Sequence, residues 1–338
     1  MGKYSSIAVI YGSDSSESEV SCRSGEYTAS RIDESRYDVY EIYARHGEWQ
    51  LVAMRRRNAM RMTFDEGARP QVDKTDFSVS VYGEKVRFDY AYVMQHGAPG
   101  ETGQMQGYLE MLGIPYSSCS SFVSAVAFDK YTCKAYLKGA EDVRLAPDMV
   151  VRKGADLSAL PGQLSERLKY PVFVKPTTAG SSFGISRVYA PEGLVQAVNF
   201  AFSESDTVLI EQSVSGRELT CAVWRGENGV KALPVVEIVT DNEYFDYDAK
   251  YNGHSEEVCP ARLSDSERSL VEETTVRIYE HLGCKGVVRV DYILASDGLY
   301  FLEVNTVPGM TSASLVPKMV RTAGLQMTDF LTDIIEHS

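Results

Sequence analysis

The sequence predicts an α/β protein whose central and C-terminal parts have α+β character. Three observations support this class. Strands and helices alternate through the first third of the chain, strands dominate the segment 146–214, and a long hairpin spans 286–305. Alternating strands and helices are typical of a mostly parallel sheet with helices on its faces. A chain of 338 residues can bury a large core, and we expect it to divide into two or three domains.

The first third of the chain carries the clearest alternation. Its expected strands are 5–12, 37–44 and 90–97, and its expected helices are 18–32 and 102–113, the second closed by Gly113. Residues 77–90 alternate around "YGEK" and predict a hairpin, within an insert at about 64–90. Only one glycine follows the first strand, so the G-x-G-x-x-G signature of dinucleotide binding is absent.

The remaining two thirds begin with a helix expected over 121–139. Further strands are expected at 146–154, 170–176, 184–190 and 207–214, with a helix at 191–205. Beyond them we expect two strands around a turn within 217–240, an irregular loop over 241–261, a long helix at 265–283 and the final hairpin.

Composition excludes several classes of protein. The net charge of −13 lacks the basic footprint of a nucleic-acid-binding protein. No apolar run reaches the length of a signal peptide or the roughly 18 residues of a membrane span, so we expect no membrane partner and a cytoplasmic location. The six cysteines are scattered without a C-x-x-C pair, which argues against zinc and disulfides and favours reduced thiols.

The stretch "PVFVKPTTAGSSFGISRV" (171–188) places Lys175 before a run of small residues. A P-loop has the opposite order, with its lysine after the glycines and a helix following. Here a strand is expected after the glycines. Backbone N–H groups of such a loop can face phosphate oxygens while the lysine supplies a positive charge.

The final hairpin carries an acidic face. Glu303 and Asn305 are two residues apart on a strand and therefore point to the same side. If 296–298 ("SDG") form a three-residue loop, Asp291 lies opposite Glu303, whereas a two-residue turn shifts the register by one and turns Asp291 away. Opposed carboxylates require a cation, and oxygen ligands of these types suit Mg²⁺. Taken alone, the trio also fits an ordinary solvated face.

Further charged residues favour a binding site at this hairpin over an ordinary solvated face. Lys130, Lys175 and Lys250, each unremarkable alone, together supply the positive charges that a nucleoside triphosphate needs beside Mg²⁺. The strand that ends near Glu211 is followed by Glu218, and such a strand exit suits an adenine edge and a ribose.

At this point the chain resembles the D-alanine–D-alanine ligase family of ATP-grasp enzymes. The resemblance rests on "SSESEVSCRSG", "QHGAPGETGQMQGYLEMLGIPYSS", "VKPTTAGSSFGISRV", "FDYDAKY" and "GVVRVDYILASDGLYFLEVNTVPGMTSASLVP", in family order from about residue 5 to 330. It implies an ATP-grasp fold behind an N-terminal Rossmann-like parallel-sheet domain. We expect domains at 1–125, 126–215 (the lid) and 216–338 (the catalytic part).

The resemblance also implies a reaction. In such ligases the carboxylate of a first D-alanine attacks the ATP γ-phosphate, and the amine of a second D-alanine displaces phosphate from the resulting acyl phosphate. It further implies ATP and D-alanine as substrates, two Mg²⁺ ions that Mn²⁺ could replace, and a homodimer.

Site residues follow from the same resemblance, position by position. Asp291, Glu303 and Asn305 match the Mg²⁺ ligands, and Lys130, Lys175, Glu211, Glu218 and Lys250 match ATP contacts. Glu17 matches the partner of the first D-alanine ammonium, in a hydrogen-bonded set with Ser181 and Tyr251, and Arg289 with the N–H of Gly309 matches the oxyanion donors. His96, Glu101 and Ser314 match substrate contacts, the last holding the second D-alanine carboxylate.

Two departures and three alternatives accompany this interpretation. Phe183 stands where the family usually has valine, and Ala313 where some members have histidine. D-serine or D-lactate could replace the second D-alanine, although Tyr251 favours an amine acceptor. A nucleotide-binding module without catalysis is the third alternative, and the intact set of lysines and carboxylates argues against it.

Overall fold

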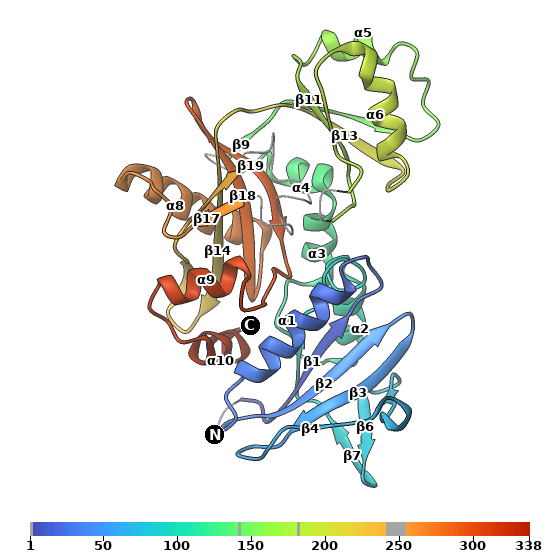
Figure 1. The fold of residues 1–338 in the computed structure, drawn as a ribbon, viewed down its shortest axis with the longest axis vertical. Helices are drawn as coiled ribbons and strands as arrows, with labels where there is room; N and C mark the ends of the chain where they lie inside the picture. The colour runs from blue at the N-terminus through green and yellow to red at the C-terminus, as the bar shows by residue number, and fades with distance from the viewer. Residues whose placement is uncertain (1–2, 141–142, 181–182, 241–254) are drawn as a thin grey trace.

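The computed structural model describes residues 3–140, 143–180, 183–240 and 255–338. Figure 1 shows three groups of elements: an N-terminal sheet with its helices, a lid made of a small sheet with its own helices, and a C-terminal sheet. The two ends of the described chain meet, since the Lys3 N–H donates to Glu336 at 3.0 Å. The predicted α/β class is confirmed.

The N-terminal sheet has the strand order β4-β3-β2-β1-β8. Its strands are β1 (Ser6–Gly12), β2 (Asp38–Arg45), β3 (Glu48–Arg55), β4 (Met62–Thr63) and β8 (Tyr90–Val93), and α1 (Ser18–Arg31) and α2 (Gln104–Leu112) accompany it. The expected parallel pairing of the three predicted strands is confirmed for β2, β1 and β8, whereas β3 and β4, which were not predicted, add antiparallel pairs. The chain reverses at His46 and Gly47, both at positive φ, in a tight turn that adds strand β3.

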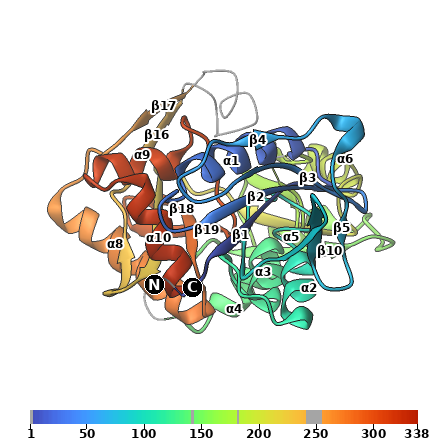
Figure 2. The same cartoon turned by 90° about the horizontal axis from the view of Figure 1, so that it is seen from below.

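The predicted insert forms a small antiparallel sheet of its own, whose first strand, β5 (Val72–Asp73), is labelled in Figure 2. It comprises the short 3₁₀ helix η1 (Glu66–Ala68) and the strands β5 (Val72–Asp73), β6 (Ser78–Val81) and β7 (Glu84–Arg87). The turn between β6 and β7 is Tyr82-Gly83, again with positive φ at both residues. The expected hairpin within 77–90 is confirmed.

The helix expected over 121–139 is two helices, α3 (Ser121–Phe128) and α4 (Lys130–Leu137). Asp129 between them is extended, and its carboxylate accepts from the Thr132 N–H at 2.7 Å. This N-cap starts a new helix instead of continuing the old one. The break frees the Lys130 N–H to donate to the Thr177 carbonyl in the lid at 2.9 Å.

The lid is an antiparallel sheet in the order β10-β13-β11-β12. It contains β10 (Asp148–Arg152), β11 (Val172–Pro176), β12 (Ser186–Val188) and β13 (Thr207–Gln212), with α5 (Leu160–Ser165), the 3₁₀ turn η2 (Pro191–Gly193) and α6 (Leu194–Ala201). These elements bury a hydrophobic cluster of their own, which includes Leu164, Val174 and Val198. The strands and the helix expected between 146 and 214 are confirmed.

The C-terminal sheet runs β17-β16-β14-β18-β19-β9, with β15 beside β14. Its strands are β9 (Arg144–Leu145), β14 (Arg217–Gly226), β15 (Gly229–Ala232), β16 (Val236–Thr240), β17 (Ser255–Val258), β18 (Val287–Ala295) and β19 (Gly298–Asn305), and its helices are α8 (Asp265–Leu282), α9 (Leu315–Thr322) and α10 (Met327–His337). Three strands, not two, fill 217–240, because Pro234 lacks an N–H and separates β15 from β16. Strand β17 likewise corrects part of the loop expected over 241–261.

Two larger clusters of buried side chains support the rest of the molecule. One joins the N-terminal sheet to α9 and α10, through residues such as Ile10, Val320 and Ile334. The other packs α3, α4 and α8 against the C-terminal sheet. No helix in the part of the chain that the structure describes is long and apolar enough to cross a membrane. The expected boundaries near residues 125 and 215 stay predictions.

Candidate active site

A cavity of about 680 Å³ lies where the three groups of elements meet. The described site residues predicted from the sequence that line it are Glu17, His96, Glu101, Lys130, Lys175, Glu211, Glu218, Arg289, Asp291, Glu303, Asn305 and Gly309. Ser314 lies just behind this wall, beside Gly309. Three further predicted residues, Ser181, Lys250 and Tyr251, fall outside the described residues. Positions separated by almost the whole chain therefore converge on one cavity.

The acidic hairpin reaches the expected pairing by an unexpected route. Ala295 pairs with Gly298, so the turn has two residues, and the three-residue loop considered above is wrong. The register then shifts between Asp291 and Tyr292, because Leu302 is an extra residue on β19. This bulge restores the pairing of Asp291 with Glu303 and of Arg289 with Asn305. Both carboxylates consequently share one face.

Asp291 is held by its neighbours on the same face. Arg289 donates to both oxygens of its carboxylate at 2.9 Å, Thr220 donates at 2.5 Å, and the Asn305 amide nitrogen donates at 3.1 Å. Burial alone would lower the pKa of Arg289, but the adjacent Asp291 outweighs it and raises that pKa. Asp291 thus stands in a fixed orientation with its charge compensated.

Lys130 connects the lid to the hairpin. Its ammonium lies 3.0 Å from a carboxylate oxygen of Glu303 and donates to the Ala179 carbonyl of the lid loop at 3.2 Å. Burial works to lower the pKa of Lys130, yet Glu303 outweighs it and the pKa is raised. Lys130 therefore stays protonated in the cavity wall.

Glu211 is buried between two lysines. One carboxylate oxygen lies 2.5 Å from the ammonium of Lys134 and the other 2.6 Å from that of Lys175. Burial favours the neutral acid, but Lys175 and Lys134 outweigh it and lower the pKa of Glu211 to about 2. The sequence interpretation missed Lys134, although its position four residues after Lys130 places both on one face of a helix.

The lid loop closes directly onto Glu17. A Cβ atom added to Gly180 would lie 2.7 Å from a Glu17 carboxylate oxygen, so only glycine fits there without displacing that carboxylate. Glu17 is the residue before α1 and makes no side-chain cap of that helix. The carboxylate is directed at the cavity and the lid loop instead.

His96 and Glu101 brace the loop that follows β19. The His96 Nδ1–H donates to the Val307 carbonyl at 2.9 Å, and Nε2 faces the Ser24 hydroxyl at 2.9 Å. Burial lowers the pKa of His96, so the ring is neutral and both nitrogens are engaged. One Glu101 oxygen accepts from the Gly97 N–H at 2.7 Å and the other from the Val307 N–H at 3.3 Å.

Burial and the neighbouring Glu17 raise the pKa of Glu101 to about 8. Two backbone N–H donors and the Arg289 charge work against this rise. The Glu101 carboxyl is therefore largely protonated at neutral pH in the absence of substrates.

Ser314 packs against Gly309, which lines the cavity. The Ser314 hydroxyl oxygen accepts from the Thr311 N–H at 3.0 Å and lies 3.0 Å from the place of a Cβ on residue 309. Ser314 precedes α9 without capping it through its side chain. Its hydroxyl is accordingly held beside Gly309, behind the cavity wall, instead of at the helix end.

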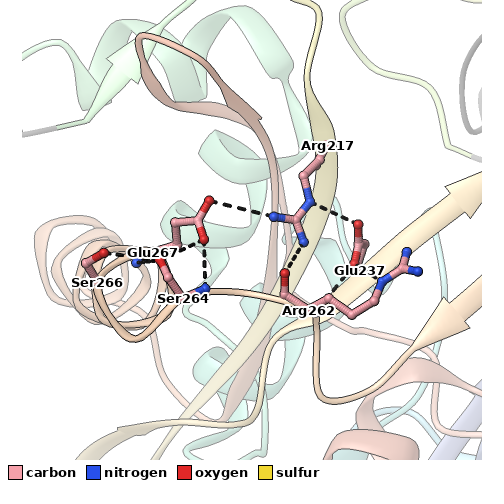
Figure 3. A network of polar contacts seen from close by, with 6 residues as sticks. All are labelled: Arg217, Glu237, Arg262, Ser264, Ser266 and Glu267. Carbon is pink, nitrogen blue, oxygen red and sulfur yellow. Dashed lines mark hydrogen bonds and ion pairs between the residues drawn. The ribbon is translucent and has the colours of Figure 1, made fainter.

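A second polar network, absent from the sequence interpretation, fixes the strand behind Glu218 (Figure 3). Arg217 donates to Glu237 at 3.0 Å and to the Arg262 carbonyl at 2.5 Å, and lies 3.7 Å from Glu267. Glu267 forms a capping box with Ser264 at the start of α8. Arg217, Glu237 and Arg262 also line the cavity, so the network is part of the cavity wall beside Glu218, the next residue on β14.

No three His, Cys, Asp or Glu side chains gather around a metal position in the described ranges 3–140, 143–180, 183–240 and 255–338. The predicted trio has a different composition, with two carboxylates and one amide. The Asn305 amide nitrogen points to Asp291, which leaves its oxygen for another partner. The set therefore supplies oxygen donors of the type that Mg²⁺ prefers.

Known proteins resemble this chain along its whole length. Family models described as "D-ala D-ala ligase N-terminus" and "D-ala D-ala ligase C-terminus" match residues 6–119 and 141–336. The D-alanine–D-alanine ligase of Phocaeicola vulgatus is 42% identical over 332 residues, which is 98% of each chain.

Solved structures agree with these matches. The VanG D-Ala:D-Ser ligase of Enterococcus faecalis has a TM-score of 0.85 at 29% identity and covers 98% of this chain and 99% of its own. D-alanyl-alanine synthetase A of Vibrio cholerae has a TM-score of 0.82 at 26% identity and covers 99% and 98%.

Proposed function

This chain belongs to the D-alanine–D-alanine ligase family, and from that premise we propose that its cavity carries out the ATP-dependent ligation of two D-alanines. The predicted ATP-grasp fold is confirmed by the solved ligases that share its architecture. The enzyme is a ligase, and its dipeptide serves the synthesis of peptidoglycan precursors. The observation that carries the proposal is the convergence of Lys130, Lys175 and Arg289 with the acidic hairpin in one cavity.

The nucleotide is proposed to lie between the lid sheet and the C-terminal sheet. Lys175 on β11 and Lys130 on α4 both line the cavity and supply the positive charge that the phosphates of ATP require. Glu218, which lines the cavity beside Arg217, suits the ribose hydroxyls. The backbone beyond Glu211 suits the adenine edge. Lys250 is proposed as a further phosphate contact by resemblance alone.

Mg²⁺ is proposed to bind at Asp291, Glu303 and Asn305. When bound, the metal would neutralise negative charge on the ATP phosphates. The protein prepares the site, since Arg289 pairs with Asp291 and Lys130 pairs with Glu303, and these contacts orient the two opposed carboxylates. Two ions, with Mn²⁺ as a substitute, are the finer proposal.

The first D-alanine is proposed to place its ammonium at Glu17. Its carboxylate would then attack the γ-phosphate, giving D-alanyl phosphate and ADP. Gly180 brings the lid loop against Glu17, so the closed loop shields the acyl phosphate from water. Ser181 and Tyr251 are proposed to complete this closure.

The second D-alanine is proposed to be held by the Ser314 hydroxyl through its carboxylate. Its amine attacks the acyl phosphate, and negative charge develops on the carbonyl oxygen. Arg289 and the Gly309 N–H are the donors for that oxyanion, and neither has to be reorganised during the step. His96 and Glu101 act by fixing the loop at Val307 that presents Gly309.

The second substrate, which accepts the D-alanyl group, could be D-alanine or D-serine. Tyr251 favours an amine, hence D-alanine over D-lactate, whereas D-serine differs from D-alanine by one hydroxyl. The test is phosphate release with ATP and Mg²⁺, supplied with D-alanine alone or with D-alanine plus D-serine or D-lactate. Mass spectrometry then identifies the product. D-alanyl-D-alanine as the main product supports the proposal, and a dominant ester or D-alanyl-D-serine overturns it.

We also propose a cytoplasmic homodimer. Exposed apolar side chains on neighbouring helices support the dimer: Met111 on α2, Phe122 on α3 and Tyr136 on α4. A cytoplasmic location follows from the need for ATP. Light scattering should give a mass of twice 37.5 kDa, and cell fractionation should recover the protein with soluble cytoplasmic markers.

A further inference from the structure

We propose that Lys134 is a positioning residue for ATP binding, which fixes Glu211 and, through Glu211, the orientation of Lys175. The inference rests on the proposed function, because it assigns a role in binding the ATP of that reaction. Lys134 itself lies behind the cavity wall and does not line the cavity. Its side chain is only 1% exposed.

Lys134 lies between two carboxylates on neighbouring strands. Asp148 on β10 pairs directly with Glu211 on β13, so two carboxylates face each other across an antiparallel ladder. Like charges in this arrangement repel. The Lys134 ammonium enters between them, 2.6 Å from an Asp148 oxygen and 2.5 Å from a Glu211 oxygen. It also donates to the Ala146 carbonyl at 2.9 Å, so three oxygen atoms surround the ammonium.

The consequence reaches the cavity through the second oxygen of Glu211. With one oxygen bound to Lys134, the other faces the Lys175 ammonium at 2.6 Å. Charges therefore alternate from Lys134 through Glu211 to Lys175, the residue proposed to contact ATP. A rotation of the Glu211 carboxylate would move the Lys175 ammonium with it.

Helix α4 connects the contacts of Lys134 to the C-terminal sheet. Cys133 and Leu137 of the helix are buried in the cluster that packs against the C-terminal sheet. Figure 1 shows α4 between that sheet and the lid strands. Lys130 pairs with the hairpin residue Glu303, while Lys134, one turn later, pairs with two lid strands. One helix thus aligns the lid lysine with the acidic hairpin.

The alternative is that Lys134 merely stabilises the fold by balancing two buried charges. That role predicts a lower melting temperature or a smaller active fraction, with unchanged affinity for ATP in the folded protein. A positioning role predicts a change in ATP affinity that exceeds any change for D-alanine. The two roles are therefore separated by Michaelis constants.

The test compares Lys134→Met with Lys138→Met, a matched change at an exposed lysine of the same helix segment. Far-UV circular dichroism and thermal melting establish that each variant is folded. KM for ATP should rise about tenfold or more in Lys134→Met, because removing one partner of a buried charge pair leaves the others uncompensated. KM for D-alanine should stay within about twofold, and Lys138→Met should match the wild type in both. If Lys134→Met does not fold, Lys134→Gln takes its place under the same criteria.

A double variant tests the cause. Adding Asp148→Asn to Lys134→Met removes the repulsion, so KM for ATP should return to within about threefold of the wild type. A wild-type KM for ATP in folded Lys134→Met overturns the proposal, and so does a double variant that shows no recovery.

Calorimetric binding of a non-hydrolysable ATP analogue repeats the comparison without turnover. A wild type that binds the analogue but makes no dipeptide would count against the proposed function alone. Equal affinities of wild type and Lys134→Met for the analogue would count against Lys134.

Discussion

Asp291 lies directly opposite Glu303 in the β18–β19 ladder, although the hairpin turn is one residue too short for that pairing. The bulge at Leu302 supplies the missing residue and brings both carboxylates to the cavity face. Opposed carboxylates without a cation destabilise a sheet, so their retention favours a cationic partner. Arg289 and Lys130 meet that need within the protein, and Mg²⁺ is the proposed third cation.

Metal dependence is the first prediction. ATP turnover should disappear in EDTA and return with added Mg²⁺, and Glu303→Gln should lower kcat at least roughly 100-fold. Glu273→Gln, the same change on the exposed side of α8, is the matched control and should behave as wild type. Undiminished phosphate release in EDTA would remove the metal assignment.

The contact between Gly180 and Glu17 gives the second prediction. Gly180→Ala would place a methyl group 2.7 Å from a Glu17 carboxylate oxygen and force either the lid loop or that carboxylate to move. We expect kcat/KM for D-alanine to fall about tenfold or more, since a displacement of about 1 Å in a positioned group can cost 100-fold. The melting temperature should hardly change.

Gly162→Ala is the matched control for that variant. Nothing lies within 4 Å of a Cβ at Gly162, which is part of helix α5, so alanine there should be neutral or slightly stabilising. Wild-type kinetics in Gly180→Ala would show that the lid loop does not close on Glu17 during catalysis.

The network around Arg217 gives a prediction about acid stability. Hydrogen bonds from Arg217, followed by those from Arg262, lower the pKa of Glu237 to about 2, although burial opposes them. A carboxyl with a lowered folded pKa stabilises the protein above its unfolded pKa of about 4.5, and this stability is lost as the pH falls toward 2. The contribution is on the order of 3 kcal/mol.

Glu237→Gln should therefore lower the free energy of unfolding at pH 6 by about 2–3 kcal/mol, and the difference from the wild type should shrink near pH 3. Urea denaturation at both values measures it. A difference that is the same at pH 6 and pH 3 would show that Glu237 carries no ionisation-linked stability.

Local patterns sufficed for much of the fold and for the acidic hairpin, because these depend on residues close in sequence. The period of two placed Glu303 and Asn305 on one face, and glycine spacing marked the lid loop. Strand β3 escaped prediction because His46-Gly47 is not a familiar hairpin dipeptide. The Leu302 bulge has no sequence signature either. The sequence analysis therefore predicted the correct pairing of Asp291 with Glu303 from a turn of the wrong length.

The buried ion pairs were harder to foresee, because their partners are distant in the chain. Lys134 meets Glu211 across 77 residues, and nothing near either residue indicates the contact. Asp148 opposite Glu211 becomes visible only once the register of β10 with β13 is known. Pairing registers between distant strands arise from tertiary packing, which a single sequence does not display.

Glu101 gives the last prediction, in a different pH range. Burial and the nearby Glu17 raise its pKa to about 8 in the folded protein, against about 4.5 when unfolded. Between these values the folded state holds a proton that the unfolded state has released, so the free energy of unfolding falls as the pH rises. The slope is at most about 1.4 kcal/mol per pH unit. The side chain of Glu101→Gln cannot titrate in this range. In the absence of substrates, the free energy of unfolding of this variant should therefore change less with pH between pH 5 and 8 than that of the wild type. The slopes of the two curves should differ by up to this amount. Parallel curves for the two proteins would show that Glu101 is already ionised at pH 5.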